Sequence, residues 1–109
     1  MTVPKDSIEN VIAVRELYLT NSQAVSRPIL VCIGRPYQNA EFGEYLCEYQ
    51  ITGVGSEEVR RITGIDAVQA LQCALVVLGA DLTALNASID NTLRWKGGEP
   101  GDVGFGAPS

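Results

Sequence analysis

The segment Asp66–Ile89 has the sequence DAVQALQCALVVLGADLTALNASI, and it is the longest stretch of the chain with a regular hydrophobic period. Its large apolar side chains recur every three or four residues, the spacing that places them on one stripe of an α-helix. The stripe consists of Val68, Leu71, Leu75, Leu78, Leu82, Leu85 and Ile89. We therefore predict one long helix that covers a core with this stripe.

The start of the helix is marked by a capping box. Asp66 can accept a hydrogen bond from a free backbone N–H of the first turn, and Gln69 can reach back from three residues later. Ile65, which precedes the cap, is expected to act as a hydrophobic staple.

Gly79 interrupts the interior of the helix and leaves two alternatives. In the first alternative, a strand or an aromatic ring crosses the helix closely at this point, which would explain why the residue has no side chain. Otherwise the chain forms two shorter helices, Asp66–Leu78 and Asp81–Asn91.

Before the helix, runs rich in β-branched and aromatic residues predict β-strands. There are four such runs, Val11–Thr20, Pro28–Arg35, Glu44–Gly53 and Glu58–Thr63. In the first, we expect the set with Leu17 and Leu19 to face the core, a set that also contains Val11, Ala13 and Arg15. The inward set of the second is Ile29, Val31 and Ile33, and the third places Tyr45, Cys47, Tyr49 and Ile51 on one face.

Short links join these strands, so the predicted fold is α+β: a four-stranded antiparallel β-meander followed by one long α-helix packed across one face. The stretch that follows, residues 93–105, contains four glycines and a proline, and we expect an irregular C-terminal tail that Trp95 and Phe105 fasten to the body. A chain of 109 residues suits a single domain, with residues 1–10 and 106–109 loosely ordered.

Composition restricts the possible partners. The formal charge of −5 and the scattered basic residues argue against nucleic-acid binding. We also expect no secretory signal and no segment that approaches a membrane span. The three cysteines, Cys32, Cys47 and Cys73, lie far apart in apolar stretches and fit reduced, buried thiols. A cytoplasmic location is therefore expected.

The residues on the helix face opposite the leucine stripe are all uncharged. This face consists of Ala70, Cys73, Val77, Ala80 and Ala84. An alanine-rich face is also what good helix propensity alone would give. We nevertheless predict that a second copy of the chain packs against it, in a two-fold homodimer. Pairing through a sheet edge is the alternative geometry.

Two further surfaces are candidates for binding. The loop 36–43 carries Tyr37 and Phe42, which either pin the loop or contact a protein partner. A pocket between the sheet and the tail, lined by Tyr45, Tyr49, Trp95 and Asp102, would instead suit a small molecule or a substrate.

Catalytic and metal chemistry find little support. The chain has no histidine and no C-x-x-C pair, so neither a transition-metal site nor a histidine-activated Cys47 thiol is predicted. The glycine-rich tail lacks the strand-to-helix order of a phosphate loop. Glu99 and Asp102 fit solvated acids better than a catalytic or calcium pair. We predict no cofactor and no catalytic residue.

Several motifs resemble one family. The G-x-D-x-x-Q-A-L element at Gly64–Leu71 and the W-x-G-G-E-P-G-D-x-G-F element at Trp95–Phe105 are similar to a group of small bacterial proteins known as a domain of unknown function. The elements R-E-L-x-L at Arg15–Leu19 and I-G-R-P at Ile33–Pro36 belong to the same resemblance, which runs from about Ala13 onward. It implies a bacterial intracellular protein and supplies no catalytic residue.

The leading hypothesis is therefore a non-enzymatic, homo-oligomeric module for protein binding or assembly. The alternative is an enzyme or small-molecule-binding protein that uses the pocket between the sheet and the tail.

Overall fold

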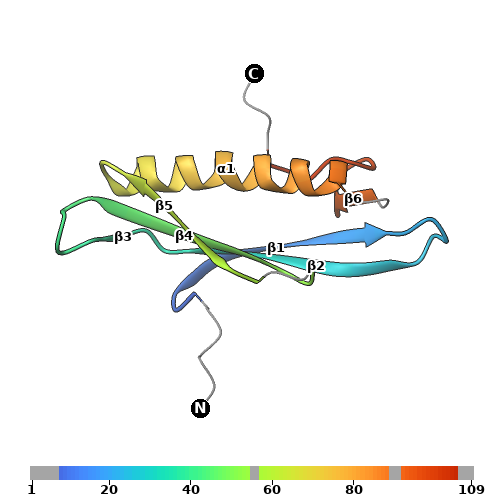
Figure 1. The fold of residues 1–109 in the computed structure, drawn as a ribbon, viewed down its shortest axis with the longest axis horizontal. Helices are drawn as coiled ribbons and strands as arrows, with labels where there is room; N and C mark the ends of the chain where they lie inside the picture. The colour runs from blue at the N-terminus through green and yellow to red at the C-terminus, as the bar shows by residue number, and fades with distance from the viewer. Residues whose placement is uncertain (1–7, 55–56, 89–91, 106–109) are drawn as a thin grey trace, which may run out of the picture.

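The computed structural model describes residues 8–54, 57–88 and 92–105. They form β1 (Val11–Thr20), β2 (Ser26–Gly34), β3 (Tyr37–Gln38), β4 (Tyr45–Thr52), β5 (Val59–Gly64), α1 (Ala67–Ser88) and β6 (Thr92–Trp95). The class is α+β, as predicted, and α1 lies along one face of the sheet (Figure 1). Most of the ends expected to be loosely ordered, residues 1–10 and 106–109, lie outside the described residues.

The sheet is antiparallel, and its central strands follow chain order as a meander requires: β1 pairs with β2, β2 with β4, and β4 with β5. The prediction of four strands is wrong, because the described residues form a six-stranded sheet. The additional strands are β3, which pairs with the start of β4, and β6, which pairs with Leu17–Thr20 of β1. Both are too short to carry a hydrophobic alternation of their own, so only their neighbours specify them.

A bulge distorts the first strand near its start. The register between β1 and β2 shifts at Ile12, which places Val11 opposite Gly34. Because strand residues alternate between faces, Val11 falls on the face turned away from α1 and not in the predicted inward set. Leu17 and Leu19, beyond the bulge, are buried as predicted.

The helix packs on β4 and β5, and the predicted stripe is confirmed in part, because Leu78 and Leu82 are fully buried and Leu71, Leu75 and Leu85 pack against the core. Ile89, the last residue of the predicted stripe, lies outside the described residues.

The buried face of α1 is nevertheless shifted from the stripe. Its buried residues are Ala70, Ala74, Leu78, Gly79 and Leu82. Val68, the first residue of the predicted stripe, is 63% exposed. Close contact with β5 explains the difference, because a Cβ atom at Gly64 would lie 2.4 Å from the backbone nitrogen of Ala70. Only small side chains fit where the helix starts against the sheet.

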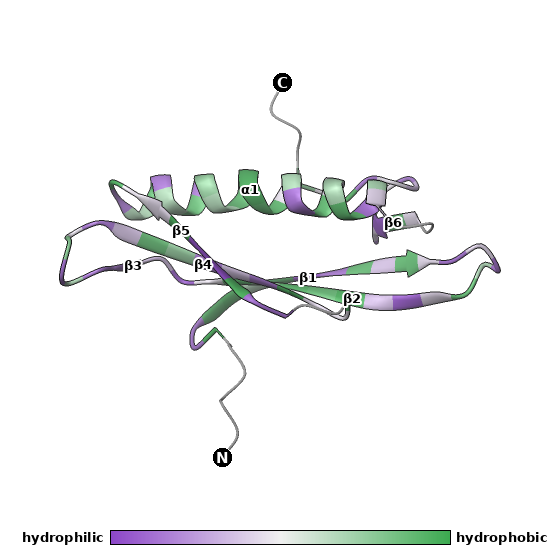
Figure 2. Cartoon of the chain, in the orientation of Figure 1, coloured by the Kyte–Doolittle hydropathy of each residue, from purple (hydrophilic) through white to green (hydrophobic). Residues whose placement is uncertain are grey.

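The core lies between α1 and the sheet, and Figure 2 shows that hydrophobic residues predominate along the helix. The inward residues predicted for the second strand are buried there, together with Cys47 and Tyr49 of β4. The tail adds Leu93 and Val103. Ile51 and Tyr45 of β4 pack at the edge of this cluster.

The capping box is confirmed. The Gln69 N–H donates to Asp66 Oδ1 at 2.8 Å, and Gln69 Oε1 accepts from the Ile65 N–H at 2.7 Å. The staple prediction is wrong, because the Ile65 side chain is 83% exposed. Helix α1 continues through Gly79, where a Cβ atom would lie 3.1 Å from the Cβ of Phe105. The close-crossing alternative is therefore the correct one, and the crossing segment is the tail.

By length and composition alone, α1 is long and apolar enough to cross a membrane, contrary to the expectation that no segment approaches such a span. A helix that packs on a sheet and covers its core can have the same length and the same apolar composition. In this chain α1 contacts β4 and β5, and its Asp81 forms an ion pair with Arg60 of β5 at 3.1 Å.

Candidate functional site

The tail folds back beside β6 through backbone hydrogen bonds. The Trp95 N–H donates to the Asp102 carbonyl at 3.0 Å, and the Gly101 N–H donates to the Leu93 carbonyl at 2.9 Å. The indole of Trp95 then lies against glycines, since a Cβ atom at Gly97 or Gly104 would come within 2.8 Å of its ring. These glycines are therefore required by the close approach of the ring.

Arg15 of β1 joins the first strand to this tail. Its Nη1 donates to the Gly104 carbonyl oxygen. Its Cζ atom lies 4.8 Å from the ring centroid of Trp95 and 4.8 Å from that of Phe105, distances at which a cation is attracted to the ring faces. The half-buried guanidinium thus holds the tail on β1.

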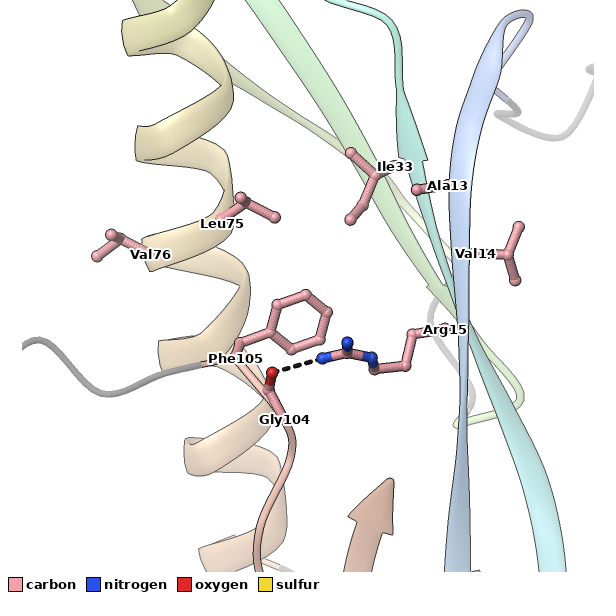
Figure 3. A pocket seen from close by; sticks show the side chains of 8 residues that line it. All are labelled: Ala13, Val14, Arg15, Ile33, Leu75, Val76, Gly104 and Phe105. Atoms are coloured by element: carbon pink, nitrogen blue, oxygen red, sulfur yellow. Dashed lines mark hydrogen bonds between the residues drawn. The ribbon is translucent and has the colours of Figure 1, made fainter. Parts of the chain in front are cut away.

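A cavity of about 380 Å³ opens beside Arg15, between β1, β2, α1 and the tail. We call it the Arg15 cavity. Figure 3 shows Ile33, Leu75 and Phe105 turned toward the space, whereas Val14 and Val76 point away from it. Arg15 supplies the only charged side chain among the described residues that line it.

A second polar cluster ties β4 and β5 to the helix. The Tyr49 hydroxyl donates to Asp81 Oδ2, and Arg60 donates to the same oxygen. Burial raises the pKa of Tyr49 far above its ordinary value, and the hydrogen bond to the Asp81 carboxylate raises that pKa further. These groups satisfy one another, which is typical of a structural cluster.

A third cluster lies on the open face of the sheet, away from α1. Glu48 Oε2 accepts from Arg61 Nε at 2.8 Å and from the Tyr37 hydroxyl at 3.2 Å. Burial first, and then the Glu48 charge, raises the pKa of Tyr37. This cluster links β3, β4 and β5. Its three side chains also line an open cavity, and Arg35 lies on the wall of that cavity.

The residues predicted to form a ligand pocket fall into two groups. Tyr45 and Tyr49 lie on β4, whereas Trp95 lies on β6 and Asp102 in the tail. Strands β2 and β1 separate β4 from β6 in the sheet, so the four side chains do not line one pocket. A cavity does lie between the sheet, the helix and the tail, but other residues line it.

The predicted self-association face is not a continuous surface. Ala70 is fully buried in the core of its own chain, so its expected outward position is wrong. Cys73 and Val77 are half-buried, and only Ala80 and Ala84 are exposed. The rotation of α1 toward β5 accounts for this.

Of the two loop aromatics, Tyr37 is tied to Glu48 and forms part of β3. Phe42 is 71% exposed at the end of the loop. The first therefore pins the loop, and the second remains available for contact.

Three exposed apolar residues that the sequence did not single out lie close together at the start of β1. Strand β6 covers only Leu17–Thr20, so the segment Val11–Glu16 has β2 on one side and no strand of the described chain on the other. We call this segment the free β1 edge. The exposed fractions of Val11, Ile12 and Val14 are 44%, 53% and 58%. The Arg15 cavity adjoins this edge. The sequence contains one signal for this region, which is Arg15 among the apolar residues of its strand face.

Comparison with known families gives one finding. A family model described as "Domain of unknown function (DUF6968)" matches residues 13–107. The matched range begins where the resemblance in the sequence was expected to begin. No curated protein and no solved structure matches the chain.

Proposed function

We propose that this chain, which belongs to the family described as a domain of unknown function (DUF6968), is a non-enzymatic module that assembles with a second copy of itself through the free β1 edge. The observation that carries the proposal is an unpaired strand segment that carries the exposed apolar side chains of Val11, Ile12 and Val14. Such an edge presents backbone donors and acceptors to any strand that can align with it.

The two edges of the sheet differ in how they are protected. The outer strand β5 has six residues and displays two exposed arginines, Arg60 and Arg61. Charges of this kind discourage pairing with another strand. On the free β1 edge, the Arg15 side chain turns inward to the tail, so Glu16 at the end of the segment is its one exposed charge, and Val11 and Val14 remain exposed on the open face. The β1 edge is therefore the better partner for another sheet.

A second copy fits this edge by symmetry. Two copies of one strand can pair antiparallel about a two-fold axis, so each surface meets its own equivalent and the sheet continues from one chain into the next. On the open face the pairing would cover Val11 and Val14. On the helix side it would bring a partner close to the exposed Val76 of α1, which lines the Arg15 cavity.

The remaining features support a non-catalytic intracellular role. The Tyr49 and Glu48 clusters are occupied in joining strands to one another and to the helix. Cys32, Cys47 and Cys73 are free thiols, which suits a reducing compartment.

Sedimentation or light scattering over a concentration series tests the assembly. We expect a species of twice the 11.7 kDa chain mass, and we expect Val14→Lys to convert it to single chains. Phe42→Lys is the matched control, because it makes the same charge change at a similarly exposed apolar residue away from the edge. Amide hydrogen exchange at residues 11–16 should slow as the dimer forms.

Three outcomes would contradict the proposal. If the wild-type protein stays monomeric throughout the concentration series, the proposed dimer does not form. Loss of the dimer in Ala80→Lys but not in Val14→Lys would move the interface to the exposed alanines of α1. Loss in Phe42→Lys alone would move it to the loop.

A further inference from the structure

The Arg15 guanidinium lacks an acidic partner in the part of the chain that the structure describes. Its contacts are the Gly104 carbonyl and the faces of Trp95 and Phe105. A guanidinium has five N–H donors, and a half-buried charge is costly unless an anion or several acceptors compensate it. Asp81 and Glu48 are already paired with the arginines of β5.

The rest of the Arg15 cavity is apolar. Ala13, Ile33, Leu75 and Phe105 supply most of its wall. Its volume of about 380 Å³ falls in the range of small-molecule sites, roughly 300–1,000 Å³. In Figure 3 the guanidinium lies beside Phe105, with Leu75 and Ile33 across the same space. One cationic group therefore borders an open, mainly apolar cavity.

We propose that the Arg15 cavity binds a small monocarboxylate with an aliphatic body. The carboxylate would accept hydrogen bonds from the Arg15 donors that Gly104 leaves unused, in the fork geometry that guanidinium groups favour. The aliphatic chain would lie among Ile33, Leu75 and Phe105 and lose its contact with water. The site is built within one chain, so it goes beyond the assembly role and does not depend on it.

Trp95 provides a direct probe, because it is the only tryptophan and its ring stacks on Arg15. Octanoate, titrated below its micelle concentration, should change the Trp95 emission in a saturable way. Octanol, which has the same chain without the charge, should bind at least tenfold more weakly, since one charge-assisted interaction of about 1.4 kcal/mol corresponds to a factor of ten. The same titration with Val11→Lys, a change on the free β1 edge at a residue that does not line the cavity, separates ligand binding from assembly.

Two variants examine the two parts of the site. Arg15→Gln should weaken octanoate at least tenfold and abolish the preference over octanol, whereas Arg94→Gln, the same change on an exposed residue of β6, should leave both unchanged. Ala13→Leu fills the cavity and keeps the guanidinium, so it should weaken octanoate while the NMR signal of Arg15 Nε keeps its position.

Equal responses to octanoate and octanol would overturn the proposal, and so would a response that never saturates. Octanoate affinity that survives both Arg15→Gln and Ala13→Leu would also overturn it. If Arg15→Gln loosens the tail, Ala13→Leu still decides the result.

Discussion

Tyr49 is the residue at which stability and pH are most closely linked. Its buried hydroxyl donates to Asp81, and burial and this bond hold its pKa far above the ordinary value. A tyrosine in the unfolded chain loses its proton near pH 10. Above that pH the folded chain holds a proton that the unfolded chain has released, so the free energy of unfolding falls as pH rises.

Tyr49→Phe removes this bond and keeps the ring. We expect the free energy of unfolding at pH 8 to fall by about 1–2 kcal/mol, because the hydroxyl donates to a charged acceptor. The difference between wild type and variant should shrink as pH rises above about 10. Urea unfolding at pH 8 and at higher pH measures both quantities. A difference that does not change with pH would contradict the assignment.

At the scale of elements, the sequence predicts best what depends on local signals. The long apolar period and the Asp66–Gln69 box specify α1, and alternation specifies β4. Strands β3 and β6 were not predicted, because each exists only through pairing with a distant strand. The rotation of α1 depends on the Gly64–Ala70 contact, which no helical period contains.

The contact of α1 with the tail gives a prediction for Gly79. A Cβ atom there would lie 3.1 Å from the Phe105 Cβ and 3.3 Å from its carbonyl oxygen. Gly79→Val should therefore lower the free energy of unfolding by about 1–3 kcal/mol through overpacking, although valine favours a helix more than glycine does. Ala80→Val, at the adjacent exposed position, should cost less than about 1 kcal/mol. Thermal unfolding of both variants is the measurement, and equal losses would argue against the crossing.

At the scale of the molecule, the sheet has α1 on one face only, and the open face carries Val14 and Leu30 as well as the Glu48–Arg61 pair. The sequence indicates an excess of apolar surface on the outer side of the second strand, at Leu30 and Cys32, and on the back of the helix, but not on the first strand. Its true distribution depends on the bulge at Ile12 and on the point at which β6 ends, and both are products of strand pairing. The sequence does not predict the Arg15 cavity either, because the position of its walls also depends on strand pairing.

A protein that dimerises through the free β1 edge should melt at a higher temperature as its concentration rises, because mass action favours the associated folded state. Val14→Lys should remove this concentration dependence, and Phe42→Lys should retain it. Calorimetry at several concentrations gives the comparison. A wild-type melting temperature that is independent of concentration would exclude a dimer coupled to folding.

The bond from Arg15 to Gly104 spans 89 positions of the sequence. During synthesis β1 leaves the ribosome long before β6 and the tail. Until β6 is made, the whole outer edge of β1 is unpaired. Contacts of such long sequence separation close late. The nascent chain therefore covers the Leu17–Thr20 part of β1 only once β6 and the tail have been synthesised, and until then the strand is open to pairing with a neighbouring chain.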